Sequence, residues 1–279
     1  MKRWLIGCFI GIVLLISVPV IYGVFIEPYQ IEIHHVRIQD PFFEKFLGNK
    51  TVIQLSDLHI ENIGKREQNI LKILDDLKPD IIFLTGDYVK WKGNYEAALA
   101  FLSQLKAKIG IWGVMGDYDY SSSRKSCLFC HREGSKQFTQ RYSIRFLRDS
   151  SELLNLPEGT LRIEGIEFKK EYTNLSYGKS LPLKMIDPSI ILSHSPLSFN
   201  LLDINQNLFM VAGDTHGGQV PLPSWFSGII GYEKNASYSQ GYFKNGNAKM
   251  YVSRGIGTSH IPIRLFRKPE IVVLHFSAN

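Results

Sequence analysis

The stretch Thr51-Val52-Ile53-Gln54-Leu55-Ser56-Asp57-Leu58-His59 joins a strand pattern to two residues that can bind metal. The run from Thr51 to Leu55 is short, mostly apolar and rich in β-branched residues, which predicts a buried strand. In open α/β sheets, ligands bind in the crevice outside the carboxyl ends of the strands. A D-x-H string alone is a weak signal, because surface residues produce it as well. Its position after a strand nevertheless predicts that Asp57 and His59 point into such a crevice.

Four further apolar runs end in the same way. The strings at their ends are Thr85-Gly86-Asp87, Gly116-Asp117-Tyr118-Asp119, Ser193-His194 and Gly213-Asp214-Thr215-His216. Carboxylate oxygens and imidazole nitrogens suit divalent metals such as manganese, magnesium, iron and zinc. Five strand ends that each deliver Asp or His therefore indicate a dinuclear metal site.

The rest of the body alternates between strand and helix patterns. Helices are predicted over Glu67–Leu77 and from about Tyr95 to Leu105, because their apolar residues follow the helical period. Strands are predicted before, between and after them, and more strands follow in the second half. The predicted strands after the first are Ile81–Leu84, Gly110–Met115, Thr160–Ile166, Ser189–Leu192, Leu208–Ala212, Ala248–Ser253 and Glu270–Phe276. This order predicts a layered α/β fold, with residues 29–279 as one catalytic domain.

Composition excludes few partners. The chain has 279 residues, with 32 basic and 26 acidic side chains and a net charge of +6. This mild charge suits an anionic substrate or a membrane surface. The sequence contains no long basic run or aromatic-basic stripe, so we do not expect nucleic acid as a partner.

Residues 1–28 are predicted to be a membrane anchor. An uncharged apolar run from Trp4 to Ile26 follows Lys2 and Arg3 and is long enough to span a bilayer. We see no small-x-small cleavage site, which favours an uncleaved anchor over a removed signal peptide. Lys2 and Arg3 favour an inside N-terminus with the domain outside. The basic residues that soon follow on the other side leave a half-inserted anchor with an inside domain as an alternative.

The ordered motifs resemble those of the calcineurin-like metallophosphoesterases, whose usual strings are D-x-H, G-D, G-N-H-D, H and G-H-T-H. Three further segments resemble the membrane-anchored bacterial branch of this family: Glu27-Pro28, Gly217-Gly218-Gln219, and the run from Ser253 to Ser259 with Pro262-Ile263-Arg264. The resemblance implies a four-layer α-β-β-α sandwich and two divalent metal ions. By this resemblance Asp57, His59, Asp87 and His216 hold the first metal. Asp87 bridges to a second metal, which Asp117, His194 and Asp214 complete.

The chain departs from the family pattern at three positions. Asp117 replaces the family's Asn and Asp214 replaces its first His, and both can still bind metal. The resulting oxygen-rich second site favours manganese or magnesium over zinc. Tyr118 replaces the His that assists the leaving group in the family. We expect Tyr118 and the neighbouring Asp119 to act in catalysis, with Tyr118 positioning the substrate.

Three other segments carry functional hypotheses. Residues 121–149 are predicted to be a basic insertion that attracts the anionic substrate, through Arg124, Lys125, Arg132 and Arg141. Cys127-Leu128-Phe129-Cys130-His131 matches the c-type haem string, so a non-enzymatic redox or haem-binding module is an alternative. Free thiols or a local zinc pair are simpler interpretations. Trp225, Phe226, Ile229 and Tyr232 are either core or a lipid-facing rim.

The sequence as a whole resembles the UDP-2,3-diacylglucosamine pyrophosphohydrolases of lipid A synthesis. This resemblance implies hydrolysis of the pyrophosphate of a lipid-linked nucleotide to UMP and 2,3-diacylglucosamine 1-phosphate. It also implies a location on the bacterial inner membrane, on the cytoplasmic face for this substrate and otherwise on the outer side. The alternative within the enzyme class is a phosphodiesterase or phosphatase of unknown substrate. The oligomeric state is left open.

Overall fold

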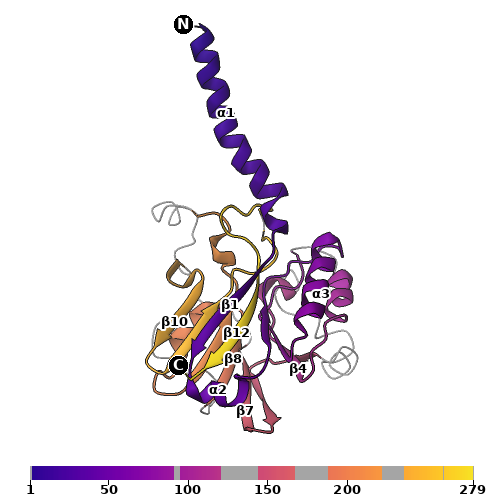
Figure 1. Ribbon diagram of the computed structural model, residues 1–279, viewed down its shortest axis with the longest axis vertical. Helices are drawn as coiled ribbons and strands as arrows, with labels where there is room; N and C mark the ends of the chain where they lie inside the picture. The colour runs from indigo at the N-terminus through magenta and orange to yellow at the C-terminus, as the bar shows by residue number, and fades with distance from the viewer. Residues whose placement is uncertain are drawn as a thin grey trace.

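The computed structural model describes residues 2–90, 95–120, 144–166, 188–221, 236–259 and 261–278. Two six-stranded sheets pack face to face, and a long N-terminal helix projects from one end of the sandwich (Figure 1). The α/β architecture predicted from the sequence is therefore confirmed.

The first sheet combines strands from both ends of the chain. Its order is β1 (Glu32–Gln39), β12 (Glu270–Ser277), β2 (Val52–Leu55), β3 (Ile81–Leu84), β4 (Gly110–Gly113) and β5 (Ile144–Phe146). β2, β3, β4 and β5 run parallel to one another. β12 pairs parallel with β1 and antiparallel with β2. The last strand of the chain thus lies inside the sheet, between its first two strands.

The second sheet also has parallel strands at its centre. Its order is β10 (Gly241–Asn245), β11 (Ala248–Val252), β9 (Leu208–Ala212), β8 (Ser189–Ser193), β7 (Gly159–Ile166) and β6 (Ser150–Leu156). The central strands β7, β8, β9 and β11 are parallel, and antiparallel hairpin partners close the two edges. Because a central parallel strand is buried on both faces, its residues are apolar almost throughout. β8 and β9 show this pattern, with every residue buried.

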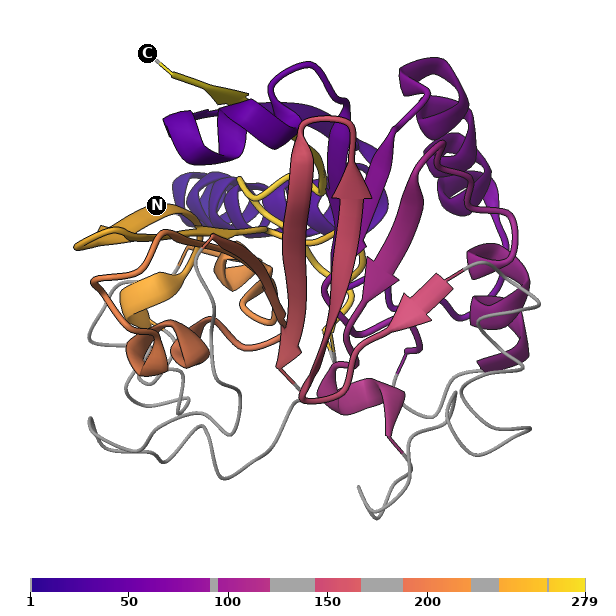
Figure 2. The same ribbon diagram turned by 90° about the horizontal axis from the view of Figure 1, so that it is seen from below.

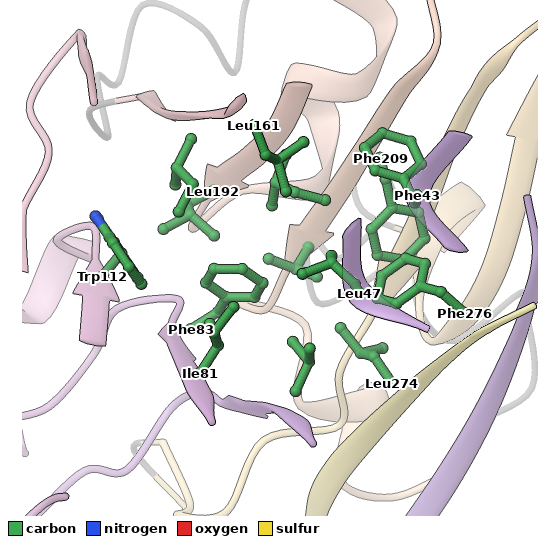
Figure 3. Packing of buried hydrophobic residues seen from close by; sticks show 14 of the residues in the cluster. Phe43, Leu47, Ile81, Phe83, Trp112, Leu161, Leu192, Phe209, Leu274 and Phe276 are labelled. Carbon is green, nitrogen blue, oxygen red and sulfur yellow. The ribbon is translucent and has the colours of Figure 1, made fainter. Parts of the chain in front are cut away.

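The main core lies between the two sheets. Alternate residues along each strand point to opposite faces, and Ile81 and Phe83 of β3 face the second sheet while Ile82 and Leu84 face the helices. Figure 3 shows this inter-sheet core, to which Phe83 and Leu192 contribute along with Phe209 and Phe276, whose rings pack edge to face. The sandwich therefore holds its strand ends in a fixed relation to one another.

Helices cover the outer face of the first sheet (Figure 2). α3 (Lys65–Leu77) packs Ile70 and Leu74 against this face, and α4 (Tyr95–Leu102) adds Phe101 and Leu102. Over the second sheet, the described residues form the short 3₁₀ helices η4 (Pro196–Leu201) and η6 (Ala236–Tyr238) in place of α-helices. Three of the four expected layers are thus regular, and the described part of the fourth is 3₁₀ helix and loop.

The helix α1 (Lys2–Phe25) is 24 residues long. It is long and apolar enough to cross a membrane, and most of its described side chains are exposed. The short η1 (Glu27–Tyr29) then leads into β1. The N-terminal apolar segment expected from the sequence is therefore a continuous helix.

The structure adds elements that the sequence analysis did not predict. The helix α2 (Pro41–Leu47) begins at Asp40, whose carboxylate accepts hydrogen bonds from the backbone N–H groups of Phe42 and Phe43. An Asp followed by Pro is a recognisable local signal for the start of a helix. β6 and β10 are edge strands with mostly exposed residues. β5 falls inside the predicted insertion 121–149, whose last residues therefore belong to the sheet.

Candidate metal centre

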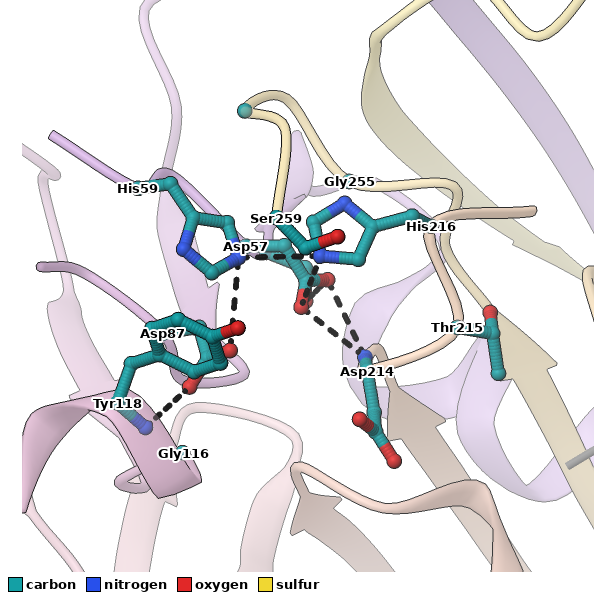
Figure 4. Close-up of polar contacts among 12 residues, drawn as sticks. Asp57, His59, Asp87, Gly116, Tyr118, Asp214, Thr215, His216, Gly255 and Ser259 are labelled. Carbon is teal, nitrogen blue, oxygen red and sulfur yellow. Dashed lines mark hydrogen bonds and ion pairs between the residues drawn. The ribbon is translucent and has the colours of Figure 1, made fainter. Parts of the chain in front are cut away.

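All five predicted motifs come together at one end of the sandwich. They follow β2, β3 and β4 in the first sheet and β8 and β9 in the second, and these strands are parallel within each sheet. Because parallel strands end at one edge, the two sheets bring their motifs together, and Figure 4 shows Asp57, His59, Asp87 and His216 gathered at this edge. Each of the seven predicted ligand residues lies within 4 Å of another one: Asp57, His59, Asp87, Asp117, His194, Asp214 and His216.

The first group of candidate metal ligands lies around the two histidines His59 and His216. Their Nε2 atoms lie 3.0 Å apart. The Nε2 atom of His216 is 3.7 Å from Oδ1 of Asp57, and that of His59 is 3.5 Å from Oδ2 of Asp87. Neighbouring ligands of one ion with bonds of about 2.1 Å are separated by about 3.0–3.4 Å. These donors therefore have nearly the spacing that a single ion requires.

A second group surrounds His194. Its Nε2 atom lies 3.5 Å from Oδ1 of Asp87, 3.7 Å from Oδ1 of Asp214 and 3.9 Å from Oδ1 of Asp117. The other ring nitrogen, Nδ1, lies 2.8 Å from the backbone carbonyl oxygen of Thr85. A carbonyl oxygen can only accept, so Nδ1 carries the proton and donates it. In the neutral ring, Nε2 is then the unprotonated nitrogen that a metal ion would use.

Asp87 connects the two groups. Its Oδ2 faces His59 and its Oδ1 faces His194, and both histidine side chains are completely buried. The backbone N–H of Tyr118 donates to the same Oδ1 over 3.0 Å and fixes the orientation of the carboxylate. One carboxylate that presents an oxygen to each group is the geometry of a bridging ligand.

The backbone of these ligands is unusual. Asp57, His59, Asp87, Asp214 and His216 all have φ between 44° and 74°, in the left-handed region. Asp and His tolerate this region better than most residues, and a sharp turn directly after a strand turns the side chain back across the strand end. Such conformations cost about 1–3 kcal/mol each and are concentrated at functional sites.

Glycines allow the loops to approach closely. A Cβ added to Gly116 would lie 2.1 Å from Oδ1 of Asp87, and one added to Gly213 would lie 1.9 Å from Oγ of Ser56. Both positions therefore require glycine. Glycine also precedes aspartate in three of the five motifs, which explains part of the sequence pattern.

Substitution of Gly116 by Ala should damage the centre without removing a ligand. The new methyl group would push the carboxylate of Asp87 away, so we expect metal affinity and activity to fall by about 10–100-fold. Metal titration by calorimetry and hydrolysis of an aryl phosphodiester would measure both. Gly64→Ala is the matched control, because its Cβ would meet nothing closer than 3.5 Å. Equal behaviour of the two variants would contradict this account of Gly116.

Buried acidic groups dominate the electrostatics. Burial raises the pKa of Asp57, and burial together with the nearby Asp117 and Asp119 raises the pKa of Asp87 well above its usual range. Burial opposes protonation of His194, but the carboxylates of Asp87, Asp214, Asp57 and Asp117 raise its pKa to about 10. Burial and neighbouring positive groups lower the pKa values of His59 and His216.

This pattern fits a cation site. Donor atoms of Asp57, His59 and His216, and of Asp57, Asp87 and His194, lie close enough together to hold a metal ion. Asp117 and Asp214 add two carboxylates beside His194. The three imidazoles can bind a cation in their neutral form. Divalent cations would compensate the negative charge of these closely spaced carboxylates. The donors are oxygen and nitrogen atoms throughout, which suits a hard or borderline divalent metal.

Asp119, for which we expect a catalytic role, accepts a set of backbone hydrogen bonds. Its side chain is fully buried. Its oxygens accept hydrogen bonds from the backbone N–H groups of Asp87, Tyr88 and Gly116 over 2.8, 2.8 and 2.9 Å. Burial raises the pKa of Asp119 to about 7. Both oxygens of Asp119 are thus engaged by backbone N–H groups around Asp87, and its expected direct part in catalysis stays a prediction.

Tyr118 lies beside the first group. Its ring meets the ring of His59 edge to face, with centroids 4.7 Å apart. The residue belongs to the 3₁₀ helix η2 (Asp117–Asp119) that follows β4. Its position next to the predicted ligands is compatible with contact to a substrate.

Arg264 is a site residue to which the sequence analysis assigned no role. It is completely buried, and its Nη2 lies 3.4 Å from Nδ1 of His216. The same guanidinium donates to the carbonyl oxygens of Arg254, Gly257 and Arg267 over 2.6–3.0 Å. Arg264 thus connects the closing motif to the loop of His216. Its place in a G-x-G-T-S-x-x-P-x-R string was the available signal.

Several predicted residues lie outside the described part of the chain. They are the four basic substrate residues Arg124, Lys125, Arg132 and Arg141, the cysteines Cys127 and Cys130 with His131, and the apolar segment with Trp225 and Phe226. The hypotheses attached to them remain sequence predictions.

The geometry and the motifs define a class of protein. The family model for calcineurin-like phosphoesterases matches residues 50–217, which contain all seven predicted ligands. The chain belongs to this family and is a metal-dependent phosphoester hydrolase.

Particular relatives resemble nearly the whole chain. The uncharacterized metallophosphoesterase YkuE of Bacillus subtilis is 26% identical over 90% of this chain and 87% of its own length. The B. subtilis metallophosphoesterase YkoQ is 23% identical over 94% of this chain and 96% of its own length. The UDP-2,3-diacylglucosamine pyrophosphatase LpxG of Chlamydia muridarum is 24% identical, covering 96% of this chain and 97% of the relative.

Proposed function

We propose that this chain is a membrane-anchored, dinuclear hydrolase that cleaves the pyrophosphate of UDP-2,3-diacylglucosamine. The products would be UMP and 2,3-diacylglucosamine 1-phosphate. The observation that carries the dinuclear site is the carboxylate of Asp87, which presents one oxygen to His59 and the other to His194. Similarity to LpxG along nearly the full length supports the substrate class.

The seven ligand residues divide into two sets. Asp57, His59 and His216 would hold one cation with Asp87, and Asp117, His194 and Asp214 would hold the other with the same Asp87. Because the second set is rich in oxygen, we propose manganese there, with magnesium next. Two bound divalent cations supply Lewis-acid polarisation of the phosphoryl group and of a water molecule.

Other residues of the protein orient the candidate metal ligands for this chemistry. Asp119 and Tyr118 fix the loop and the carboxylate of Asp87 through backbone hydrogen bonds. Thr85 selects the ring tautomer of His194. The basic residues of segment 121–149 are proposed to bind the anionic substrate, because the four site carboxylates alone would repel it.

The anchor fits the same function. α1 would hold the domain at the bacterial inner membrane, where a diacylated substrate is located. For this substrate we propose the cytoplasmic face. A segment that is 24 residues long and nearly free of charge is adequate for a single span.

The direct test is hydrolysis by the purified full-length chain in detergent with manganese. UDP-2,3-diacylglucosamine should yield UMP, identified by mass spectrometry, and chelation should abolish the reaction. The variant Asp87→Asn serves as the inactive control. Absence of UMP, together with hydrolysis of an aryl phosphodiester, would reject this substrate and leave a phosphodiesterase of another substrate.

The presence of tyrosine at position 118 leads to a separate prediction about which leaving groups the enzyme prefers. An alkyl phosphodiester expels a strongly basic alkoxide, for which a His acid gives about 10²–10⁴-fold help. A tyrosine with an ordinary pKa near 10 is a poorer donor at neutral pH. A pyrophosphate expels a weakly basic phosphate and needs less help. The wild type should therefore prefer pyrophosphates over alkyl diesters, and Tyr118→His should raise alkyl diester hydrolysis relative to pyrophosphate hydrolysis.

Steady-state kinetics on both substrate types would measure this ratio. Tyr118→Phe is the matched control, because it keeps the ring against His59 and removes only the hydroxyl. Equal rates of the wild type on alkyl diesters and pyrophosphates would show that this interpretation of Tyr118 is wrong.

A further inference from the structure

One loop joins the end of α1 to the metal-binding motif. We call residues 261–268 the interface loop. Its Arg264 donates its backbone N–H to the carbonyl oxygen of Gly23 in the last turn of α1 over 2.8 Å. The carboxylate of the buried Glu27 accepts the backbone N–H groups of Phe266 and Arg267 over 2.9 and 2.5 Å. The loop is therefore fixed to the point where the helix leaves the domain.

The contact with α1 is close. A Cβ added to Gly23 would lie 2.8 Å from the carbonyl oxygen of Arg264 and 2.9 Å from Cγ1 of Ile263. Only glycine permits the helix to approach the loop to this distance. The last turn of α1 thus packs directly on the domain and does not hang from a free linker.

The other side of the interface loop contacts the residues that follow His216. Leu265 donates its backbone N–H to the carbonyl oxygen of Gln219 over 2.9 Å, and the side chain of Gln219 donates to the carbonyl oxygen of Ile261 over 3.2 Å. Arg267 donates from Nε to the carbonyl oxygen of Gly217 over 2.9 Å. One short loop therefore lies between the helix end and the metal centre.

The interface loop exposes large apolar side chains. Phe266 is 71% exposed and Ile261 is 64% exposed. Phe266 also has a φ of 56°, which is costly for a large residue. The backbone hydrogen bond to Glu27 holds it in this conformation. Phe25, Ile26 and Tyr29 expose further apolar surface at the end of α1. Figure 1 shows the loops of the C-terminal region, in yellow, at the base of the helix.

The length of α1 sets the level of this surface in a membrane. A helix of 24 residues is about 36 Å long, whereas the hydrocarbon core is about 30 Å thick. Its last turn then lies at the boundary between acyl chains and headgroups. Because Arg264 bonds to that turn, the interface loop lies at the same level. The exposed Lys268 follows the apolar residues, which suits a headgroup region with anionic lipids.

We propose that the interface loop, with Phe25, Ile26 and Tyr29, is a membrane-contact surface that inserts into the bilayer spanned by α1. It would hold the domain so that the loop of His216 faces the lipid surface. The phosphate of a lipid headgroup could then reach the metal centre while its acyl chains stay in the membrane. This proposal rests on the proposed anchor role of α1. It requires no particular headgroup.

The test uses the full-length chain in vesicles of phosphatidylethanolamine and phosphatidylglycerol. Phe266→Trp should show blue-shifted emission and strong quenching by lipids brominated near the headgroup, after subtraction of the wild-type signal from its four tryptophans. Tyr242→Trp on the edge strand β10 is the matched control, an exposed aromatic residue elsewhere on the domain. Its emission should remain unquenched.

Two outcomes would overturn the proposal. If Phe266→Trp showed water-like, unquenched emission, this surface would lie outside the bilayer and would be a contact for a protein partner. Equal quenching at positions 266 and 242 would indicate general adsorption of the domain. The measurement does not depend on catalysis, so quenching at position 266 alone would support the surface even if UDP-2,3-diacylglucosamine proved not to be the substrate.

A functional measurement complements the depth measurement. Ile261→Ser combined with Phe266→Ser should lower hydrolysis of a substrate embedded in vesicles more than hydrolysis of a water-soluble aryl phosphodiester. The reason is that apolar burial at the interface contributes to the orientation of the domain. Parallel loss on both substrates would indicate that the two residues only stabilise the fold, and it would count against the membrane contact.

Discussion

Replacement of Asp87 by Asn should abolish hydrolysis, with a loss of at least about 10³-fold. Loss of a single preorganised electrostatic group costs about 10²–10³-fold, and Asp87 faces both halves of the centre. Its two oxygens point to His59 and His194 at 3.5 Å each. An amide at this position offers one weak acceptor oxygen and no charge, so it cannot replace a bridging carboxylate. Hydrolysis of an aryl phosphodiester and elemental analysis of bound metal would measure the effect.

The same substitution should not destabilise the metal-free protein. Burial and neighbouring carboxylates raise the pKa of Asp87 well above its usual range, so its charge is unfavourable without a cation. With a chelator present, Asp87→Asn should unfold at the wild-type temperature or above it. Asp40→Asn is the matched control. Asp40 is also fully buried, but it caps α2 and pairs with Lys249, so its loss should reduce stability and leave activity intact. Full activity of Asp87→Asn would show that Asp87 is not a ligand of the metal centre.

Replacement of Arg264 by Met should lower the free energy of unfolding by roughly 3–5 kcal/mol, because it leaves several buried acceptors without donors. The guanidinium donates to the carbonyl oxygens of Arg254, Gly257 and Arg267. Burial lowers the pKa of Arg264 to about 10, so it remains charged at neutral pH.

Urea unfolding of the full-length chain in detergent would measure the stability of this variant. The loss should persist in the presence of a chelator, since it arises from hydrogen bonds within the protein. Lys268→Met removes an exposed charge from the same loop and should change stability by less than about 0.5 kcal/mol. The free energy of unfolding of Arg264→Lys should lie between those of Arg264→Met and Lys268→Met, because an ammonium group cannot reach all the acceptors. Wild-type stability of Arg264→Met would contradict the role assigned to this arginine.

Much of the fold and the residues of the candidate site could be predicted from the sequence alone. The strands β2, β3, β4, β8 and β9 were predicted to within two residues at each end, because buried parallel strands are short apolar runs that a window of sequence reveals. Their common ending in Asp or His indicated that the residues would meet. The helix α3 was predicted from its apolar period, and α1 from its uncharged length.

Elements with weaker local signals were missed. β6 and β10 lie at sheet edges, where half or more of the residues are exposed and no apolar run forms. β5 is three residues long and is stabilised by its pairing with β4, not by its own sequence. Such strands depend on the neighbouring strand that they extend.

The contacts among the residues of the site could not be predicted from the sequence, because they depend on how the chain packs. The motif of Asp119 predicts a catalytic role, and its oxygens also bind the backbone of Asp87 and Tyr88, about thirty positions earlier in the chain. Arg264 contacts His216 across 48 positions. The interface loop meets Gly23 and Glu27 from the opposite end of the chain. Periodicity and spacing describe only neighbours along the chain, whereas these contacts arise from the order in which distant strands pair and the two sheets pack.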